Sequence, residues 1–264
     1  MIPEQTAGAL ADASRLCHQL VEARFAVAYG SHVRGTSDGG SDLDLLYVGD
    51  TPLDGARIAW LAAEVRSVHR RHGLRLDDEV SYEVKLYASS DEITQAIGFN
   101  GYRIDAAGGL TVPPVLDDPA YLNSAAFKSR LLVNALTSPH IFIGGNVSPY
   151  RYYQGRAGRT MALVALSLLD DLDTLAVTDA ATALINGRES GRTGKDFLGY
   201  TEADRPLLYG LLQVGFAELT ARHVLRELDG AHFHHDQAAR RALIARTAHP
   251  STAGIGGQPQ QAAR

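Results

Sequence analysis

Residues 29–48 read YGSHVRGTSDGGSDLDLLYV, and this stretch decides the fold that the rest of the chain serves. It holds a Gly-Ser pair, a polar glycine-rich segment, and Asp42-Leu43-Asp44 at the entry to an apolar run. Residues two apart on a strand point to the same side, so we expect Asp42 and Asp44 to share one face. Two carboxylates held that close repel by roughly 4 kcal/mol at an effective dielectric near 20. The pair therefore predicts a cation between them; the alternative is a solvated turn before a core strand.

Length, composition and charge indicate a globular protein. The chain has 264 residues, of which 45% are hydrophobic, enough for one large domain or two of ordinary size. The net charge of −5 disfavours nucleic acid as a partner, because a nucleic-acid surface normally shows clustered Lys and Arg. A nucleotide is still allowed, since magnesium can neutralise its phosphates. The single cysteine, Cys17, suits a reducing cytoplasm. The N-terminus lacks a signal-peptide pattern and the apolar run at 161–169 is too short to span a bilayer, so we expect a cytoplasmic protein without a membrane partner.

Apolar periodicity outward from this stretch predicts a small α+β domain. Residues 74–87, LRLDDEVSYEVKLY, alternate apolar and polar side chains except at Asp78, which predicts a third strand with one polar face. The other elements expected here are helices over 9–23 and 56–72, buried strands over 25–29 and 43–48, and a short helix, irregular chain and a strand at 109–112 within 90–119.

Proline and glycine clusters predict a domain boundary between residues 115 and 120, after which the periodicity becomes helical. Residues 201–204, TEAD, are typical of a capping box at the start of a long helix. Helices are expected over 121–136, 155–172, 178–186 and 205–228. The predicted domains are an α+β domain over 1–118, an all-α helical bundle over 119–249, and a disordered tail over 250–264.

The Gly-Ser pair at residues 30–31, followed about ten residues later by Asp42-x-Asp44, resembles the signature of the polymerase-β-type nucleotidyltransferase superfamily. The family pattern also has an acid on a following strand, and Asp77, after Leu76, is similar to it. The resemblance covers about residues 20–90. It implies a nucleotidyltransferase fold with a mixed sheet, in which Asp42, Asp44 and Asp77 are the catalytic acids and bind two Mg²⁺ ions.

The residue types agree with what the resemblance implies. Glycine lets a backbone approach phosphates, and a helix start or a guanidinium can bind them. The expected nucleotide-binding residues are Gly30, Ser31, Arg34 and Ser41. The third carboxylate is Asp77, Glu79 or Glu83, and the sequence does not decide between them, because all three share the polar face of the expected third strand. Lys85 on the same face could pair with one of the two remaining acids. Whichever it is would also act as general base toward an acceptor hydroxyl. For His32, a surface position is favoured over a phosphate contact.

The resemblance implies a magnesium-dependent enzyme that transfers a nucleoside monophosphate to a hydroxyl of a small molecule and releases pyrophosphate. AMP from ATP is the leading case. Its helical part is similar to that of antibiotic nucleotidyltransferases acting on aminoglycosides and lincosamides, where it helps to form the acceptor pocket. Acids at 170–173 would attract a cationic aminoglycoside, or they form an exposed helix end. The alternatives are a protein or tRNA acceptor, as in toxin–antitoxin nucleotidyltransferases, and a catalytically silent nucleotide-binding module. Another NTP and a homodimer are both compatible with the sequence.

Three further stretches each allow two interpretations. Tyrosines and arginines over 150–159 suit base stacking and phosphate contacts, or a helix entry. Residues 187–199, GRESGRTGKDFLG, suit a closing loop over an anion, or a linker. The histidines at 232–235 suit a zinc site, but without a second ligand cluster a solvated tail is favoured.

Overall fold

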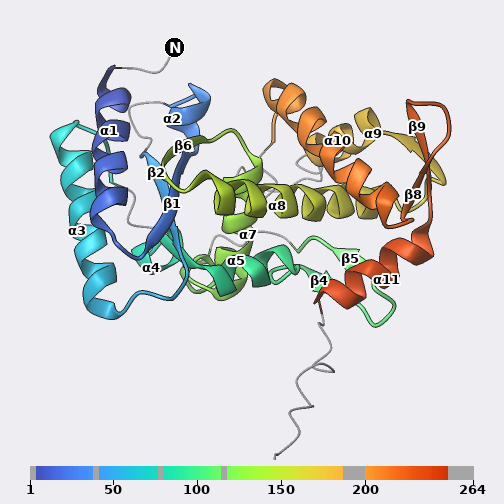
Figure 1. Cartoon of the computed structure of the whole chain (residues 1–264), viewed down its shortest axis with the longest axis horizontal. Helices are drawn as coiled ribbons and strands as arrows, with labels where there is room; N and C mark the ends of the chain where they lie inside the picture. Colours follow the sequence, from blue (N-terminus) through green and yellow to red (C-terminus); the bar gives the residue numbers. More distant parts are fainter. Residues whose placement is uncertain (1–3, 38–41, 77–79, 114–117, 187–199, 249–264) are drawn as a thin grey trace, which may run out of the picture.

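The computed structural model describes residues 4–37, 42–76, 80–113, 118–186 and 200–248. Its centre is a four-stranded mixed sheet of order β3-β2-β1-β6 (Figure 1). Strand β2 runs antiparallel to β1 and parallel to β3, and β6 runs antiparallel to β1. The strands are β1 (Ala23–Tyr29), β2 (Asp44–Gly49), β3 (Tyr87–Ser89) and β6 (Ile141–Gly145).

Strand register gathers several chain segments at one end of this sheet. Tyr29, the last residue of β1, pairs with Asp44, the first residue of β2, and Ala28 pairs with Ile141, the first residue of β6. The short helix α2 (Ser31–Arg34) follows β1 directly at this end. We call it the acidic end, after Asp42 and Asp44.

The two faces of the sheet pack against two separate apolar clusters. Leu43, Leu45 and Tyr47 belong to the cluster shared with α1 (Glu4–Gln19) and α3 (Gly55–Arg71), which cover the left side of the sheet in Figure 1. The alternate residues of β2, Leu46 and Val48, belong to the cluster on the other side. The predicted alternation along this strand, and the helices and strands predicted before residue 73, are confirmed, with bounds that shift by up to five residues.

The strand predicted over 74–87 is wrong. Arg75 makes one isolated parallel bridge to Asp42, and the chain then leaves the sheet. Helix α4 (Tyr82–Lys85) follows, and β3 begins only at Tyr87. The apolar side chains at 82, 84 and 86 are buried in this conformation, as they were expected to be in a strand, so their alternation does not distinguish a strand from a helical turn followed by extended chain. Stacking of the Arg66 guanidinium on the Tyr82 ring, 4.3 Å from its centroid, favours the turn.

The second half is mostly helical, with its chain order as predicted. The expected helix at 121–136 is divided in two because Ser124 caps a new helix through its hydroxyl, which accepts a hydrogen bond from the Phe127 amide. The capping box at Thr201 and Asp204 is present and leads into α10. The helices are α6 (Pro119–Leu122), α7 (Ala125–Thr137), α8 (Val147–Leu168), α9 (Val177–Asn186), η1 (Glu202–Asp204), α10 (Arg205–Ala221) and α11 (Gln237–Ala248).

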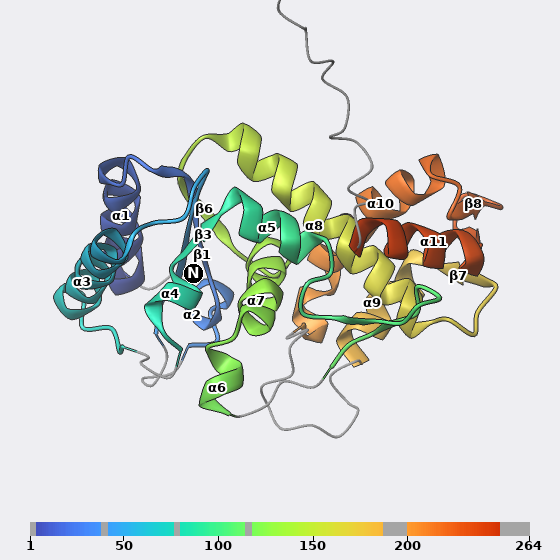
Figure 2. The same cartoon turned by 90° about the horizontal axis from the view of Figure 1, so that it is seen from below.

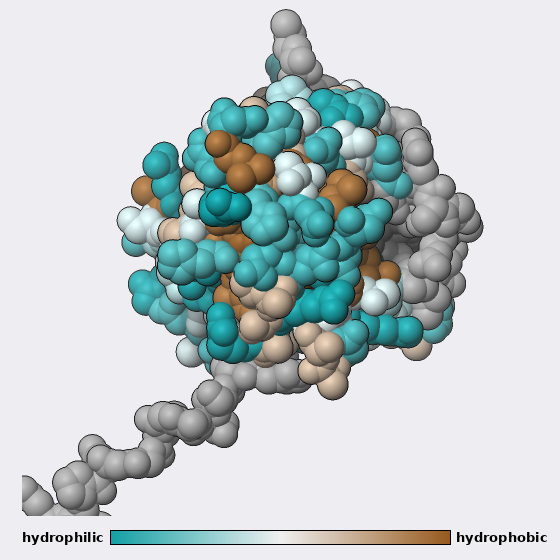
Figure 3. All heavy atoms as spheres, turned by 90° about the vertical axis from the view of Figure 1, so that its right-hand side faces the viewer, coloured by the Kyte–Doolittle hydropathy of each residue, from teal (hydrophilic) through white to brown (hydrophobic). Residues whose placement is uncertain are grey.

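The expectation of an all-α second half is wrong. Helix α10 ends before His223, whose positive φ of 59° turns the chain back, and the two strands that follow join an earlier one in a three-stranded sheet of order β7-β9-β8. Its strands are β7 (Thr174–Ala176), β8 (Leu225–Glu227) and β9 (His232–His235). The histidine tract therefore lies in a strand with His235 buried, not in a solvated tail. Hydrophilic side chains cover most of this end of the molecule, with apolar ones scattered among them (Figure 3).

The boundary predicted at residue 118 does not separate two cores. Strand β6, from beyond it, is an edge strand of the central sheet. One apolar cluster continues from Val27 and Leu46 through Leu132 to Leu163 on α8 and Phe216 on α10. Helices α5 (Ser90–Ile97), α7 and α8 lie beside the sheet in both views (Figures 1 and 2). The molecule is thus a mixed α/β structure whose sheet is completed by its second half. No helix among the described residues is both long enough and apolar enough to cross a bilayer.

Candidate active site

The closest approach at the acidic end is between Gly30 and Asp44. Gly30 has φ of +82°, and a Cβ built on it would lie 2.0 Å from the Asp44 Oδ2 atom. The carboxylate of Asp44 therefore lies directly against the backbone of the Gly-Ser turn, in space that a side chain at residue 30 would fill. The backbone conformation also favours glycine. This contact explains physically why the two halves of the motif belong together.

Asp42 lies two residues before Asp44 and pairs with Lys85. The Lys85 Nζ atom is 3.5 Å from the Asp42 Oδ2 atom, and side-chain exposures are 8% and 19%. A buried ammonium group needs a partner, and this carboxylate supplies it. The sequence left Lys85 to pair with one of the remaining acids among Asp77, Glu79 and Glu83; among the described residues its ammonium group lies beside Asp42, because α4 turns Lys85 inward.

A tyrosine hydroxyl accompanies the two acids. Tyr29, opposite Asp44 in the sheet, is 6% exposed, and its hydroxyl has no hydrogen-bond partner among the described residues. Burial, together with the negative charges of Asp44 and Asp42, raises the pKa of Tyr29 well above its ordinary value. The hydroxyl therefore keeps its proton and stays a neutral donor beside the carboxylates.

His69 on α3 holds the backbone between the two acids. Its Nδ1 atom is 2.9 Å from the Val65 carbonyl oxygen, and its Nε2 atom lies 3.3 Å from the Leu43 amide and 3.1 Å from the Leu43 carbonyl. With the proton on Nδ1, the ring donates to Val65 and accepts from the Leu43 amide. The Leu43 peptide between the two acids is thereby tied to α3.

Helix α2 places Ser31 at its first position, as expected for a residue presenting its amide at a helix start. His32, expected at the surface, is only 7% exposed, and its Nδ1 atom lies 3.1 Å from the Thr6 hydroxyl on α1. That expectation is wrong because α1 starts at Glu4 and covers this residue. His32 is therefore a structural link between α1 and α2.

Arg34, expected to bind a phosphate, makes an ion pair with Asp204. The Arg34 Nη1 atom is 3.1 Å from Asp204 Oδ2, and the side chains are 17% and 6% exposed. The same carboxylate oxygen accepts from the Thr201 amide and hydroxyl. Arg34 thus ties the Gly-Ser turn to the start of α10 across 170 residues of chain. The capping pattern of Asp204 was visible in the sequence, but its long-range partner was not.

The expected third acid and Ser41 cannot be placed. Asp77, Glu79 and Ser41 lie outside the described residues, and Glu83 is exposed on α4 rather than on a strand face shared with them. Within the described part of the chain, no group of three or more His, Cys, Asp or Glu side chains is arranged to hold a metal ion. The structure therefore brings together Gly30, Asp42 and Asp44.

The sequence interpretation missed a second polar group at this end, formed by His140 and Tyr150. His140 immediately precedes β6, two strands away from Asp44, or about 10 Å at ordinary strand spacing. Its Nδ1 atom is 2.7 Å from the Ser138 carbonyl and its Nε2 atom 2.7 Å from the Tyr150 hydroxyl. Burial lowers the pKa of His140, so the ring is neutral, donates to Ser138 and accepts from Tyr150. Only the tyrosine-rich entry of α8 signalled this group in the sequence.

A groove of about 780 Å³ opens beside Tyr150, between the first halves of α8 and α10. It has the volume of a small-molecule site. Its lining residues in the described part of the chain are apolar, small or amide-bearing, with Arg151 as the one charged side chain among them and no acid. The lining is Tyr150, Arg151, Gln154, Gly155, Gly158, Pro206, Leu207, Gly210, Leu211 and Val214.

No model of a known protein family matches this chain, and no curated protein matches its sequence. What the site can do must therefore be inferred from its own residues.

Proposed function

We propose that the protein is a magnesium-dependent nucleotidyltransferase of the polymerase-β type. It transfers a nucleoside monophosphate to a hydroxyl of a small molecule, with AMP from ATP as the leading case. The observation that carries the proposal is the contact of the Asp44 carboxylate with the left-handed Gly30. It joins the carboxylate pair to a turn whose backbone, without a side chain at Gly30, can approach phosphates.

The donor set fits magnesium. Asp42 and Asp44 supply the oxygen ligands that Mg²⁺ prefers, and the hydroxyl of Tyr29 is a buried polar atom without a partner among the described residues. Asp77 is the proposed third ligand, with Glu79 as its alternative. When bound, magnesium neutralises the triphosphate and activates the attacking hydroxyl.

The protein's own residues would then position the reactants. Gly30 and Ser31 would present backbone and hydroxyl to the phosphates, and the ring of His69 holds the Leu43 peptide that lies between Asp42 and Asp44. Lys85 adds a positive charge beside Asp42. Because Arg34 is engaged with Asp204, it orients the turn rather than contacting a phosphate. Positioning and charge stabilisation supply most of the rate in phosphoryl transfer.

The groove between α8 and α10 is the proposed acceptor site. It lies beside Tyr150, whose hydroxyl donates its hydrogen bond to His140. The Tyr150 oxygen can therefore accept a hydrogen bond from a hydroxyl of the acceptor substrate. Since the described residues of the lining include Arg151 and no acid, a neutral hydroxylated molecule fits them better than a polycationic aminoglycoside. Asp170, an acid considered as an attractor of cations, is paired with Arg240 and Arg241 instead.

Pyrophosphate release tests the proposal. The protein is incubated with magnesium, each labelled NTP, and separate panels of neutral polyols, aminoglycosides, tRNA and proteins. We expect labelled product with a neutral hydroxylated acceptor. The variants Asp42→Asn and Asp44→Asn should each lose about a thousandfold of the activity, whereas Asp91→Asn, an exposed acid on α5, should lose none. Full transfer by the Asp42→Asn and Asp44→Asn variants would refute the metal site, and product only with tRNA or protein would refute the small acceptor.

A further inference from the structure

A second cavity, which we call the arginine cavity, opens away from the acidic end of the sheet. It has a volume of about 720 Å³ and is formed by the end of α5, the turn after it, β4 (Arg103–Ile104), α8 and the last turn of α11. Helix α5 starts where the parallel strands β2 and β3 end. This is the end of the sheet opposite to Asp42 and Asp44. Figure 1 accordingly shows α5, β4 and α11 below the sheet centre and α2 above it.

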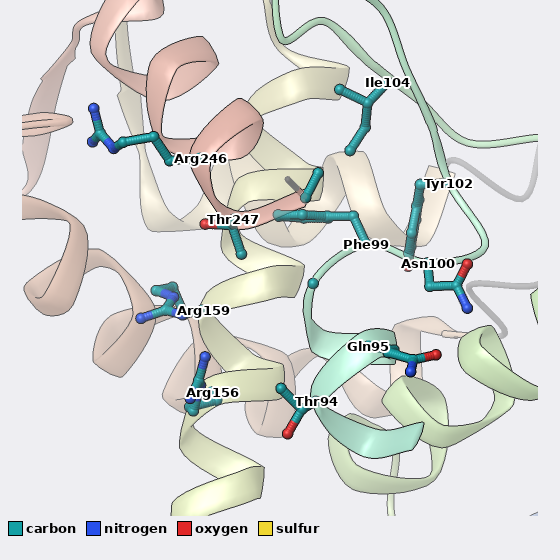
Figure 4. A pocket seen from close by; sticks show the side chains of 12 residues that line it. Thr94, Gln95, Phe99, Asn100, Tyr102, Ile104, Arg156, Arg159, Arg246 and Thr247 are labelled. Carbon is teal, nitrogen blue, oxygen red and sulfur yellow. The ribbon is translucent and has the colours of Figure 1, made fainter. Parts of the chain in front are cut away.

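Arginine dominates the chemistry of this cavity. Arg156 and Arg159 project from α8 and Arg246 from α11, while Thr94 and Gln95 on α5 lie across from them (Figure 4). Among the described residues, no Asp or Glu lines the cavity. Arginine side chains along one side of the cavity create a positive potential that draws anions.

Nearby carboxylates compensate only part of that charge. Arg159 pairs with Glu218 at 2.6 Å, but Glu218 also pairs with Arg222 at 3.0 Å. Arg156 donates to the Tyr152 hydroxyl at 2.6 Å, and within the described ranges neither it nor Arg246 has a carboxylate partner. The positive charge therefore exceeds the negative charge around the cavity.

The walls of the cavity are held firmly in place. The Thr160 hydroxyl on α8 donates to the Ile97 carbonyl at 2.8 Å, which fastens α8 to the end of α5. The following turn contains Phe99 in a left-handed conformation, with φ of 68°, an uncommon state for a bulky residue. Asn100 in this turn donates to the Ser129 hydroxyl at 2.9 Å. Firm walls reduce the entropy cost of binding a ligand.

We propose that the arginine cavity binds a phosphate-bearing small molecule, independently of the metal site. Guanidinium forks match phosphate oxygens, and arginine is enriched wherever phosphates are recognised. Phe99, Tyr102 and Ile104 give the rest of the cavity an apolar and aromatic wall, suited to a planar group attached to the phosphate. A mononucleotide has this combination, with its charge at one end and a flat ring at the other.

Calorimetric titration of the full chain without magnesium, in an Asp42→Asn, Asp44→Asn background, tests this directly. AMP, inorganic phosphate and uncharged adenosine are the probes. We expect saturable binding of AMP, weaker binding of phosphate, and binding of adenosine weaker than that of AMP by about tenfold or more, because adenosine lacks the charged group. Absence of saturable AMP binding at millimolar concentrations, or equal binding of adenosine, would overturn the proposal.

Variants locate the bound anion. Arg156→Gln with Arg246→Gln should weaken AMP binding by about ten- to a hundredfold, whereas Arg70→Gln, an exposed arginine on α3, should leave it unchanged. Equal losses of AMP binding in the double variant and in Arg70→Gln would mean that net charge alone causes the binding. No loss in the double variant would place AMP at another site. Either result refutes the proposal.

A third variant avoids any loss of the arginines' packing. Gln95→Glu changes an exposed amide to a carboxylate of the same shape on the opposite wall. It should weaken AMP binding and leave adenosine binding unchanged, since only the anion is repelled. Unchanged AMP binding by this folded variant would count against the cavity as the site.

Discussion

The acidic end of the sheet and the arginine cavity are opposite in charge and in origin. The acidic end takes Gly30, Asp42 and Asp44 from one stretch of fifteen residues, whereas the cavity takes its arginines and its apolar wall from segments between Thr94 and Ala248. The first is built by one turn and one strand pairing. The second exists only after α5, α8 and α11 have packed together. Local sites can be read from a sequence, and assembled sites need the fold.

The largest effect expected at the acidic end comes from Gly30→Ala. The new Cβ would lie 2.0 Å from the Asp44 carboxylate oxygen, so the carboxylate must move and nucleotide transfer should fall by more than about a hundredfold. Stability should fall by about 2–4 kcal/mol, from strain plus displacement. Gly35→Ala is the matched control, with φ of +71° but open space around it; it should cost about 1 kcal/mol and keep activity.

Chemical denaturation and transfer assays measure both variants. If the two regions are independent, AMP binding in the arginine cavity should survive Gly30→Ala at temperatures where the variant is folded. Equal activity of the Gly30→Ala and Gly35→Ala variants would show that the contact with Asp44 has no importance for the site.

The next effect concerns the ion pair that joins the Gly-Ser turn to α10. Arg34→Met should destabilise the protein by about 2–3 kcal/mol, between the values for exposed and buried pairs, because Asp204 is left with one partner fewer in a buried position. Arg205→Met, which breaks a more exposed pair with Glu202, should cost under about 1 kcal/mol. A double-mutant cycle of Arg34→Met with Asp204→Asn, followed by urea unfolding, gives the coupling; a coupling energy near zero would contradict this role.

Tyr150→Phe should have a smaller effect, confined to the acceptor. Removing the hydroxyl breaks its bond to His140 and takes an oxygen from the groove, so KM for the acceptor should rise about tenfold while KM for the NTP stays the same. Tyr209→Phe, on the exposed side of α10, is the control. An equal rise of both KM values would place Tyr150 outside the acceptor site, and a change in AMP binding to the arginine cavity would show that the two regions are coupled.

The smallest effect is a pH dependence of stability. Burial lowers the pKa of His140 and of His235, so the unfolded chain binds protons more readily than the folded one. The free energy of unfolding that these two histidines contribute is fully present above the pKa of an unfolded histidine, about 6.5. It is lost as the pH falls toward their lowered pKa values in the folded state. The slope cannot exceed about 1.4 kcal/mol per pH unit for each histidine.

Urea unfolding between pH 8 and about pH 5.5, above the range where carboxylates titrate, measures this slope. His140→Gln should flatten it, whereas His18→Gln, at an exposed position on α1, should not. A slope that is the same in wild type and His140→Gln would contradict the neutral, hydrogen-bonded ring.

The sequence predicted most of the fold around the acidic end for a physical reason. The strands at 25–29 and 43–48 lie in a sheet that is covered on both faces, and their sequences are correspondingly apolar. The helix at 56–72 is covered on one side and has one apolar face. In both cases the pattern of apolar residues matches the surfaces that the fold buries. At 74–87 the same alternation was satisfied by α4 and an extended connection, and the strand prediction failed. β6 and the β7-β9-β8 sheet are short strands whose pairing depends on partners far along the chain, which periodicity does not record.

The candidate site was predictable to the same extent. Asp42 and Asp44 were named from strand periodicity and Gly30 from the resemblance to the family signature, and the structure places the Asp44 carboxylate against Gly30. The partners of Lys85 and Arg34 were not, because both ion pairs depend on tertiary packing. His69 and His140 carry no motif, and their importance comes only from the backbone atoms and hydroxyl that they contact.

The packing of Asp44 against Gly30 also restricts how this gene can vary. Every single-nucleotide missense change in a glycine codon gives an amino acid with a Cβ, and each such Cβ would meet the carboxylate of residue 44. No one-step substitution at position 30 avoids that collision. A lineage that alters residue 30 must therefore move or replace the side chain of residue 44, and we expect changes at the two codons to be correlated.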